Sequence, residues 1–173
     1  MHLRAFHCSS QYLAESSYTH LDADGQAKMV NVGRKESTRR IAVARGRIEV
    51  GQRVLVDIHE MKMKKGDILT VSKVAGILGA KQTSSLVPMC HQIPLDHVQV
   101  EISSCMESGS LIVESRVECH HKTGVEMESL MAVSITLLSI YDMCKSVNKS
   151  MKITDVQIVY KDKSTNSQGS ISQ

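Results

Sequence analysis

The sequence predicts an α+β fold in which helices cover one face of an antiparallel sheet. Several segments show the two-residue alternation of half-buried strands, and two longer segments place apolar residues at helical spacing. Their order is strand, helix, strand, strand, helix, strand. This succession is the split βαβ pattern of ferredoxin-like folds. Because 173 residues can bury a core without disulfides or metals, we expect one domain.

In the first half of the chain, residues 38–50 mix β-branched residues with arginines and are predicted to form a strand. The pattern of residues 53–60 is ambiguous between helix and strand. A basic loop follows over 61–66, and Asp67 can cap a new helix. That helix must end before Pro88.

In the second half, segments 98–102 and 111–119 alternate between apolar and polar residues, and Gly109 between them indicates a hairpin. Apolar residues recur at helical spacing over 127–141, and the β-branched segment 153–160 is predicted as the last strand.

The two ends of the chain differ from this body in composition. Residues 1–19 have one arginine, several serines and a single acid, so we expect a flexible leader, with an organellar transit peptide as the alternative. Residues 163–173 are small and polar, which predicts a flexible tail. The catalytic body is expected over 20–162.

Composition excludes several classes of protein. The net charge of +3 is too small for a protein that coats nucleic acid. The five cysteines form no C-x-x-C pair, which argues against a disulfide framework or a zinc ribbon and favours a reducing compartment. No uninterrupted apolar stretch approaches the roughly 20 residues that span a membrane.

Charged residues gather around the helix predicted over 127–141. Lys122 and Glu126 precede it, Glu128 lies in its first turn, and Asp142 and Lys145 follow its end. A purely structural helix needs charge only on its solvent face, so this pattern indicates chemistry. The alternatives are acids placed favourably at a helix N-terminus and a surface salt bridge at the other end.

The length of this helix limits any site built on it. Glu128 and Asp142 are 14 positions apart in the sequence, which corresponds to ~21 Å along a helix axis. One small ligand can hardly reach both in one subunit. Either the two ends serve separate sites, or a second copy of the chain completes a shared pocket at a symmetric interface. We favour the shared pocket.

The segment 86–94 is bracketed by prolines, so Cys90 and His91 are expected on a constrained loop. A histidine there can bind phosphate or move a proton near neutral pH. Cys90 as a nucleophile is an alternative, although no base lies near it in sequence. A zinc site is a further alternative, with spacings that match no common finger; it would use Cys90, His91, Cys119, His120 and His121.

Five strings occur in a characteristic order and spacing: MVNVGRKESTRR, KKGD, VAGILGAKQTSSLVPMCH, KTGVEMESL and IYDMCK. Together they resemble the cyclic pyranopterin monophosphate synthases, the MoaC family of molybdenum cofactor biosynthesis, over residues 19–162. The resemblance implies a ferredoxin-like homohexamer, a trimer of dimers with active sites at the dimer interfaces. It also implies a phosphorus-oxygen lyase that converts (8S)-3',8-cyclo-7,8-dihydroguanosine 5'-triphosphate to cyclic pyranopterin monophosphate and releases pyrophosphate.

The same resemblance implies the residues of the site. Asp142 carries over as the catalytic acid/base, assisted by Lys65 and Lys145, one of them with a pKa lowered by neighbouring positive charge. The implied substrate-binding residues are Arg40, Lys81, Met89, Cys90, His91, Glu126, Met127 and Glu128. The cations suit phosphate oxygens, and the glutamates suit ring N–H groups. We expect no resident metal or cofactor, and magnesium only together with the substrate phosphates.

Three positions depart from the family pattern: Asn31 replaces an Asp, Gln92 replaces a Pro or His, and the tail lacks the usual Gly-Gly-Lys-Ser-Gly stretch. None affects the acid/base set, so activity is expected, but substrate contacts from the tail are in doubt. By resemblance to eukaryotic members of the family, we expect the mitochondrial matrix if the leader is a presequence. The cytoplasm is the alternative.

Two non-catalytic alternatives compete with the enzyme. A ferredoxin-like RNA-binding module would stack bases on sheet aromatics, but the chain has one Phe, four Tyr and no Trp. A degenerate scaffold would not need the intact set of charged residues, which are Lys65, Glu126, Glu128, Asp142 and Lys145. We therefore expect a small-molecule substrate and no nucleic acid.

Overall fold

The computed structural model describes residues 20–21, 24–63 and 65–164. The chain divides into two units at Val30. In the first unit, a short bridge pairs Leu21 with Ala27 across a turn at Gly25, which has a φ of 75°. The predicted leader, residues 1–19, and most of the predicted tail, residues 165–173, lie outside the described residues.

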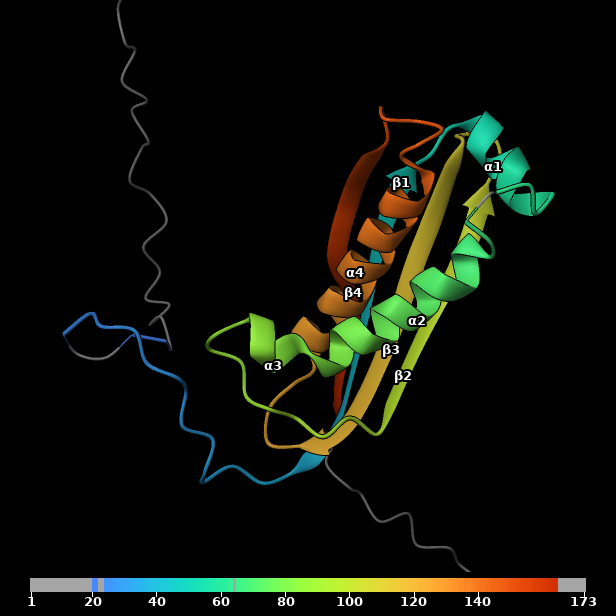
Figure 1. The fold of residues 1–173 in the computed structure, drawn as a ribbon. Coiled ribbons are helices and arrows are strands. Elements are labelled where there is room, and N and C mark those ends of the chain that lie inside the picture. The colour runs from blue at the N-terminus through green and yellow to red at the C-terminus, as the bar shows by residue number, and fades with distance from the viewer. Residues whose placement is uncertain (1–19, 22–23, 64, 165–173) are drawn as a thin grey trace, which may run out of the picture. The chain divides into compact units, whose positions relative to one another are not determined.

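The second unit contains all the helices and strands of the described ranges, and their order confirms the predicted succession (Figure 1). They are β1 (Thr38–Glu49), α1 (Gln52–His59), α2 (Ile68–Lys81), α3 (Thr83–Leu86), β2 (His97–Cys105), β3 (Ser110–His121), α4 (Glu126–Cys144) and β4 (Lys152–Ser164). The ambiguous segment is helical, as α1. The helix expected to end before Pro88 is divided into α2 and α3, and β4 continues two residues beyond Asp162.

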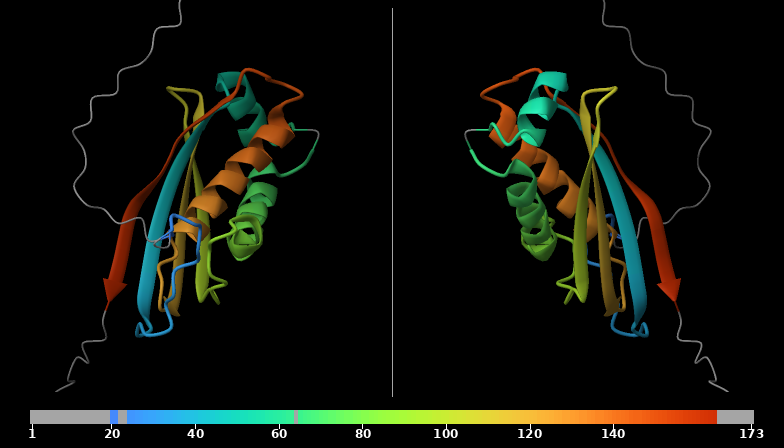
Figure 2. Two further views of the ribbon diagram at one scale, coloured as in Figure 1. Left: turned by 90° about the vertical axis from the view of Figure 1, so that its left-hand side faces the viewer. Right: turned by 90° about the vertical axis from the view of Figure 1, so that its right-hand side faces the viewer.

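The four strands form one antiparallel sheet in the order β2-β3-β1-β4. In its centre, Ala44 of β1 lies opposite Ser115 of β3 and Ile158 of β4. The helices lie on one face of this sheet and leave the other face open, as Figure 2 shows. The ferredoxin-like α+β fold predicted from the sequence is thus confirmed.

The core lies between the sheet and the two long helices, and it depends on close contact between them. A Cβ on Gly46 of β1 would lie 2.8 Å from both Leu137 and Val133 of α4. A Cβ on Gly76 of α2 would lie 2.8 Å from the carbonyl oxygen of Ala132. Only glycine fits at these positions, since real Cβ atoms do not approach other heavy atoms so closely.

By length and composition α4 would suffice to cross a membrane. In the structure, however, Val133, Leu137 and Ile140 are fully buried in the core, and α4 contacts α2, β1 and β3. An apolar helix packed in this way is typical of the core of a folded domain.

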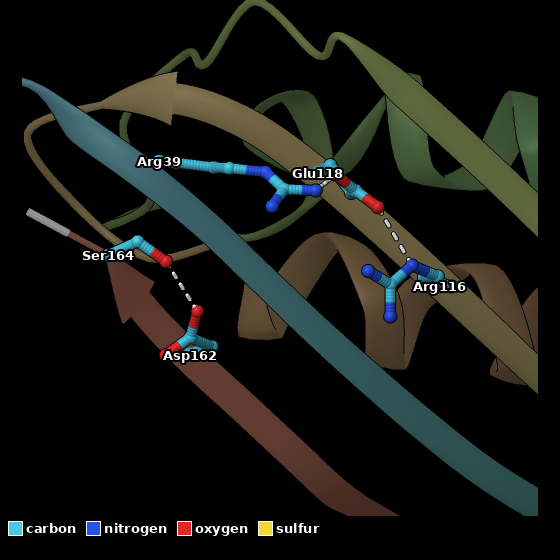
Figure 3. Close-up of polar contacts among 5 residues, drawn as sticks. All are labelled: Arg39, Arg116, Glu118, Asp162 and Ser164. Atoms are coloured by element: carbon cyan, nitrogen blue, oxygen red, sulfur yellow. Dashed lines mark hydrogen bonds and ion pairs between the residues drawn. The ribbon is translucent and has the colours of Figure 1, made fainter. Parts of the chain in front are cut away.

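The open face of the sheet carries ion pairs, both between strands and along β3. Glu118 accepts hydrogen bonds from Arg39 at 2.6 Å and from Arg116 at 2.7 Å (Figure 3). These bonds, that of Arg39 first, lower the pKa of Glu118. Arg45 pairs with Glu114 at 2.7 Å in the same way. RNA-binding sheets of this shape place stacking aromatics on their central strands, so the ion pairs disfavour the RNA-binding alternative.

Candidate functional site

The predicted site residues fall at the two ends of α4. We call these the lysine end (Lys65, Asp142 and Lys145) and the acidic end (the region around Glu126 and Glu128). Because α4 runs without interruption from Glu126 to Cys144, Glu128 and Asp142 are ~21 Å apart along its axis. The single chain therefore brings together two groups of predicted residues, and it does not unite them in one pocket.

At the lysine end, one carboxylate is held by two lysines. Lys145 Nζ lies 2.6 Å from Asp142 Oδ1. Lys65 donates to the backbone oxygen of Asp142 at 2.9 Å and lies 3.6 Å from Oδ2. The hydrogen bond and charge of Lys145, followed by the charge of Lys65, hold the pKa of Asp142 below its usual range. All three side chains remain accessible, with 45–61% exposure.

The predicted lowering of a lysine pKa does not hold for Lys145. Its pKa is raised, because the hydrogen bond and negative charge of Asp142 stabilise the ammonium form. The salt bridge that the sequence left open as an alternative is formed, and the contact of Lys145 with Asp142 raises the lysine pKa that neighbouring cations were expected to lower.

Local structure fixes both lysines. Gly66, with a φ of 82°, turns the chain after Lys65, and Asp67 caps α2 by accepting from the backbone N–H of Thr70 at 3.0 Å. After Lys145, Asn148 donates to the carbonyl oxygen of Val50 at 2.9 Å, which ties the end of α4 to the end of β1.

At the acidic end, Glu128 is only 4% exposed. Burial raises its pKa, and the carboxylate of Glu126 adds to the rise. Cys90 lies near enough for the charge of Glu128 to raise the pKa of its thiol, although burial is the larger cause. Met127 is 40% exposed, so it is accessible beside these acids.

The remaining predicted residues reach the acidic end from other elements. Near the start of α2, Ser72 forms a hydrogen bond with Ser139, which lies toward the end of α4. Further along α2, Gly76 lies against Ala132, which is earlier in α4. The two helices are therefore antiparallel, and Lys81, the last residue of α2, lies toward the start of α4. Met89 and His91 are half-buried in the loop that follows α3.

Arg40 brings a cation to the same end. It donates to the carbonyl oxygens of His121 at 3.4 Å and Lys122 at 3.3 Å. A cavity of about 310 Å³ lies beside it, and Glu126, Lys161 and Lys163 also line this cavity. Lys161 Nζ lies 3.9 Å from Glu126. The two β4 lysines were not among the predicted site residues, because the last strand was expected to end at residue 160 and Lys163 was placed in the tail, whereas β4 continues to Ser164. Their alternate positions were the available signal.

Two further groups lie at this end: His121, which was predicted only as a ligand of the alternative zinc site, and Thr38, which was not among the predicted residues. Thr38 and His121 lie opposite each other in the register of β1 and β3. Thr38 Oγ1 and His121 Nδ1 are buried, and neither atom has a hydrogen-bond partner among the described residues. Burial, together with the positive charges of His91, Lys122 and Arg40, lowers the pKa of His121. No sequence pattern points to this pair, because it depends on strand register.

The zinc and nucleophile alternatives gain no support. In the described ranges, no three His, Cys, Asp or Glu side chains gather in a way that could hold a metal ion. Burial raises the pKa of Cys119 to about 11 and also raises that of Cys90. Both thiols are therefore protonated near neutral pH, which is the less reactive form.

Fold and site together define a ferredoxin-like protein with two lysines around a carboxylate at one end of its core helix and acids, cations and a cavity at the other. Residues 29–164 match the MoaC family model. The chain belongs to this family.

Individual relatives agree with this assignment. Cyclic pyranopterin monophosphate synthase of Chloroflexus aurantiacus is 48% identical over 148 residues, 86% of this chain and 91% of that protein. Mitochondrial cyclic pyranopterin monophosphate synthase of Arabidopsis thaliana is 46% identical over 143 residues, 83% of this chain and 53% of that protein. Molybdenum cofactor biosynthesis protein 1 of Drosophila melanogaster is 43% identical over 160 residues, 91% of this chain and 28% of that protein.

The raised pKa of Glu128 predicts a pH-dependent stability. A group with a raised pKa contributes its full stability below its unfolded pKa, about 4.3 for Glu, and loses it as pH rises through the folded pKa. Glu128→Gln, which mimics the neutral acid, should therefore gain in melting temperature relative to the wild type between about pH 4 and pH 7.

The control is Asp142→Asn: because the pKa of Asp142 is lowered, its contribution is full above the unfolded pKa, about 3.9, and is lost only below it, so this variant should run parallel to the wild type between about pH 4 and pH 7. Thermal unfolding of the three proteins across this pH range checks the prediction. Parallel curves for the wild type and Glu128→Gln would contradict it.

Proposed function

We propose that this chain is a cyclic pyranopterin monophosphate synthase, a phosphorus-oxygen lyase that acts on (8S)-3',8-cyclo-7,8-dihydroguanosine 5'-triphosphate. Membership of the MoaC family and the names of its relatives support the activity. The observation that carries the proposal for the site is the lysine end, where Lys65 and Lys145 both contact Asp142.

The reaction has two requirements that these residues meet. A triphosphate needs fixed cations, and Lys65, Lys145 and Arg40 can make charge-assisted bonds to its oxygens. Forming the cyclic monophosphate requires a sugar hydroxyl to attack the innermost phosphorus. A new P–O bond forms, the bond to the outer two phosphoryl groups breaks, and pyrophosphate leaves. Asp142 is the group proposed to take up and return protons during this rearrangement.

The remaining residues have binding roles in this proposal. Glu126 and Glu128 accept N–H groups of the purine-derived ring, and Met127 and Cys90 flank it. Lys81 and His91 complete the contacts to phosphate oxygens, and Met89 lines the same loop. We propose that no resident metal or cofactor takes part, and that Mg²⁺ binds only through the substrate phosphates.

Replacing Asp142 tests the acid/base assignment. Asp142→Asn should lower the rate of product formation about 10²–10⁴-fold, the usual contribution of a general acid or base. The measurement is release of pyrophosphate and formation of cyclic pyranopterin monophosphate from the cyclised GTP substrate. Asp155→Asn on β4 is the matched control, since Asp155 has a φ of 57° that Asn tolerates. Full activity of Asp142→Asn would refute the role.

We further propose that the enzyme is a homohexamer, a trimer of dimers, whose active sites combine the lysine end of one copy with the acidic end of another. The separation of ~21 Å along α4 supports the shared site, because one substrate cannot reach both ends within one chain. The number of subunits is proposed from the family alone. A symmetric dimer supplies two such composite sites.

Subunit mixing tests the composite site. Asp142→Asn and Glu128→Ala, which removes the hydrogen-bonding group altogether, should each be inactive alone, whereas co-expression of the two should restore about a quarter of the wild-type activity. Random pairing makes half of the dimers mixed, and a mixed dimer contains one doubly altered site and one intact site. About a quarter of all sites are therefore intact. If both ends served the same chain, mixing would restore nothing. Light scattering on the mixed sample gives the number of subunits.

For the compartment, we propose the mitochondrial matrix, with the cytoplasm as the alternative. The name of the Arabidopsis thaliana relative supports the first. A fluorescent protein fused after Gln173 should co-localise with a matrix marker in eukaryotic cells, and removal of residues 1–19 should abolish this. Diffuse cytoplasmic fluorescence of the full chain would favour the alternative.

A further inference from the structure

A second basic cavity lies beside the lysine end. It has a volume of about 410 Å³ and is formed by three segments of the chain: α1, the loop before α2, and the end of α4. The residues that line it are Arg53, Asp57, Lys62, Met63, Lys65, Met143, Ser146 and Val147. Three cations and one carboxylate give this lining a net charge of +2, so the cavity suits an anion.

The cavity is continuous with the proposed catalytic cluster. Lys65 lines it and also donates to Asp142. Met143 and Ser146, which line it too, are the chain neighbours of Asp142 and Lys145. A ligand whose reacting atom lies at Asp142 can therefore extend into this space.

Arg53 is oriented for an anion. Its Nε donates to both carboxylate oxygens of Asp57, at 3.2 and 3.0 Å. The Asp57 side chain is 13% exposed, whereas that of Arg53 is 83% exposed. This contact uses only Nε, and neither terminal NH₂ group of Arg53 has a partner in the described part of the chain. The planar fork of a guanidinium matches two phosphate oxygens, so the donors that remain suit a phosphoryl group.

Lys62 supplies a second accessible cation. Its Nζ pairs with Glu60 at 2.6 Å, and its side chain is 65% exposed. An exposed ion pair of this kind contributes little to stability, so Lys62 can exchange its carboxylate for a phosphate oxygen at small cost.

We infer that this cavity binds the two outer phosphoryl groups of the substrate, which leave as pyrophosphate, and that Arg53 and Lys62 are binding residues for them. The inference rests on the proposed function for the identity of the ligand. Asp57 is a positioning residue, because it acts by holding Arg53. In this arrangement the leaving pyrophosphate lies in the cavity, and the innermost phosphorus lies beside Lys65 and Lys145.

Calorimetric titration with inorganic pyrophosphate tests this subsite without any turnover. We expect Arg53→Gln and Lys62→Gln each to weaken pyrophosphate binding at least about tenfold, the effect of losing a charge-assisted bond. Arg45→Gln is the matched control, because Arg45 also pairs with a carboxylate, Glu114, but lies on the open face of the sheet. Its binding should equal that of the wild type.

Two results would overturn the inference: no pyrophosphate binding to the wild type, or unchanged binding to Arg53→Gln and Lys62→Gln. If Arg53→Gln fails to fold because Asp57 loses its partner, Arg53→Lys keeps the charge without the fork and should still weaken binding. Product assays on the same samples separate the two proposals. If the wild type binds pyrophosphate but forms no product, and the variants lose pyrophosphate binding, the subsite is supported and the proposed activity is refuted.

Discussion

The structure depends on α4 being held between the sheet and α2. Gly46 lets α4 approach β1, and Gly76 lets α2 approach α4. Between them, Leu137 and Ile140 are fully buried, and burying each contributes ~1.5–3 kcal/mol relative to exposure. The residues from Glu128 to Asp142 lie in one continuous helix, so these two side chains stay ~21 Å apart along its axis. This separation is what prevents one chain from closing a pocket around both charged clusters.

The two ends of α4 place carboxylates in opposite environments. Asp142 is exposed, and the lysines lower its pKa, whereas Glu128 is buried and its pKa is raised. Two acids on one helix are therefore biased toward different protonation states. A neutral Glu128 can donate one hydrogen bond as well as accept others, which suits a ring edge that presents both donors and acceptors.

Periodicity was sufficient to predict the sheet and α4, because half-buried strands and amphipathic helices leave regular patterns. It failed at α1, whose eight residues are too short for the helical period to be distinguished from alternation. The proximity of Lys65 to Asp142, 77 residues away, came only from family resemblance, since no local pattern encodes a tertiary contact. The pairing of Thr38 with His121 required the register of two strands, which spacing alone does not fix.

The ion pairs of the lysine end also bear on how Asp142 could act. A carboxylate with a lowered pKa is a weak base, and the cause here is the hydrogen bond and charge of Lys145, followed by Lys65. Both lysines are exposed and can turn toward phosphate oxygens. Once they do so, the interactions that lower the pKa of Asp142 weaken, and negative phosphate charge nearby raises it further. Substrate binding would then make Asp142 a stronger base for the proposed reaction, while in the free protein the same carboxylate holds the two lysines together.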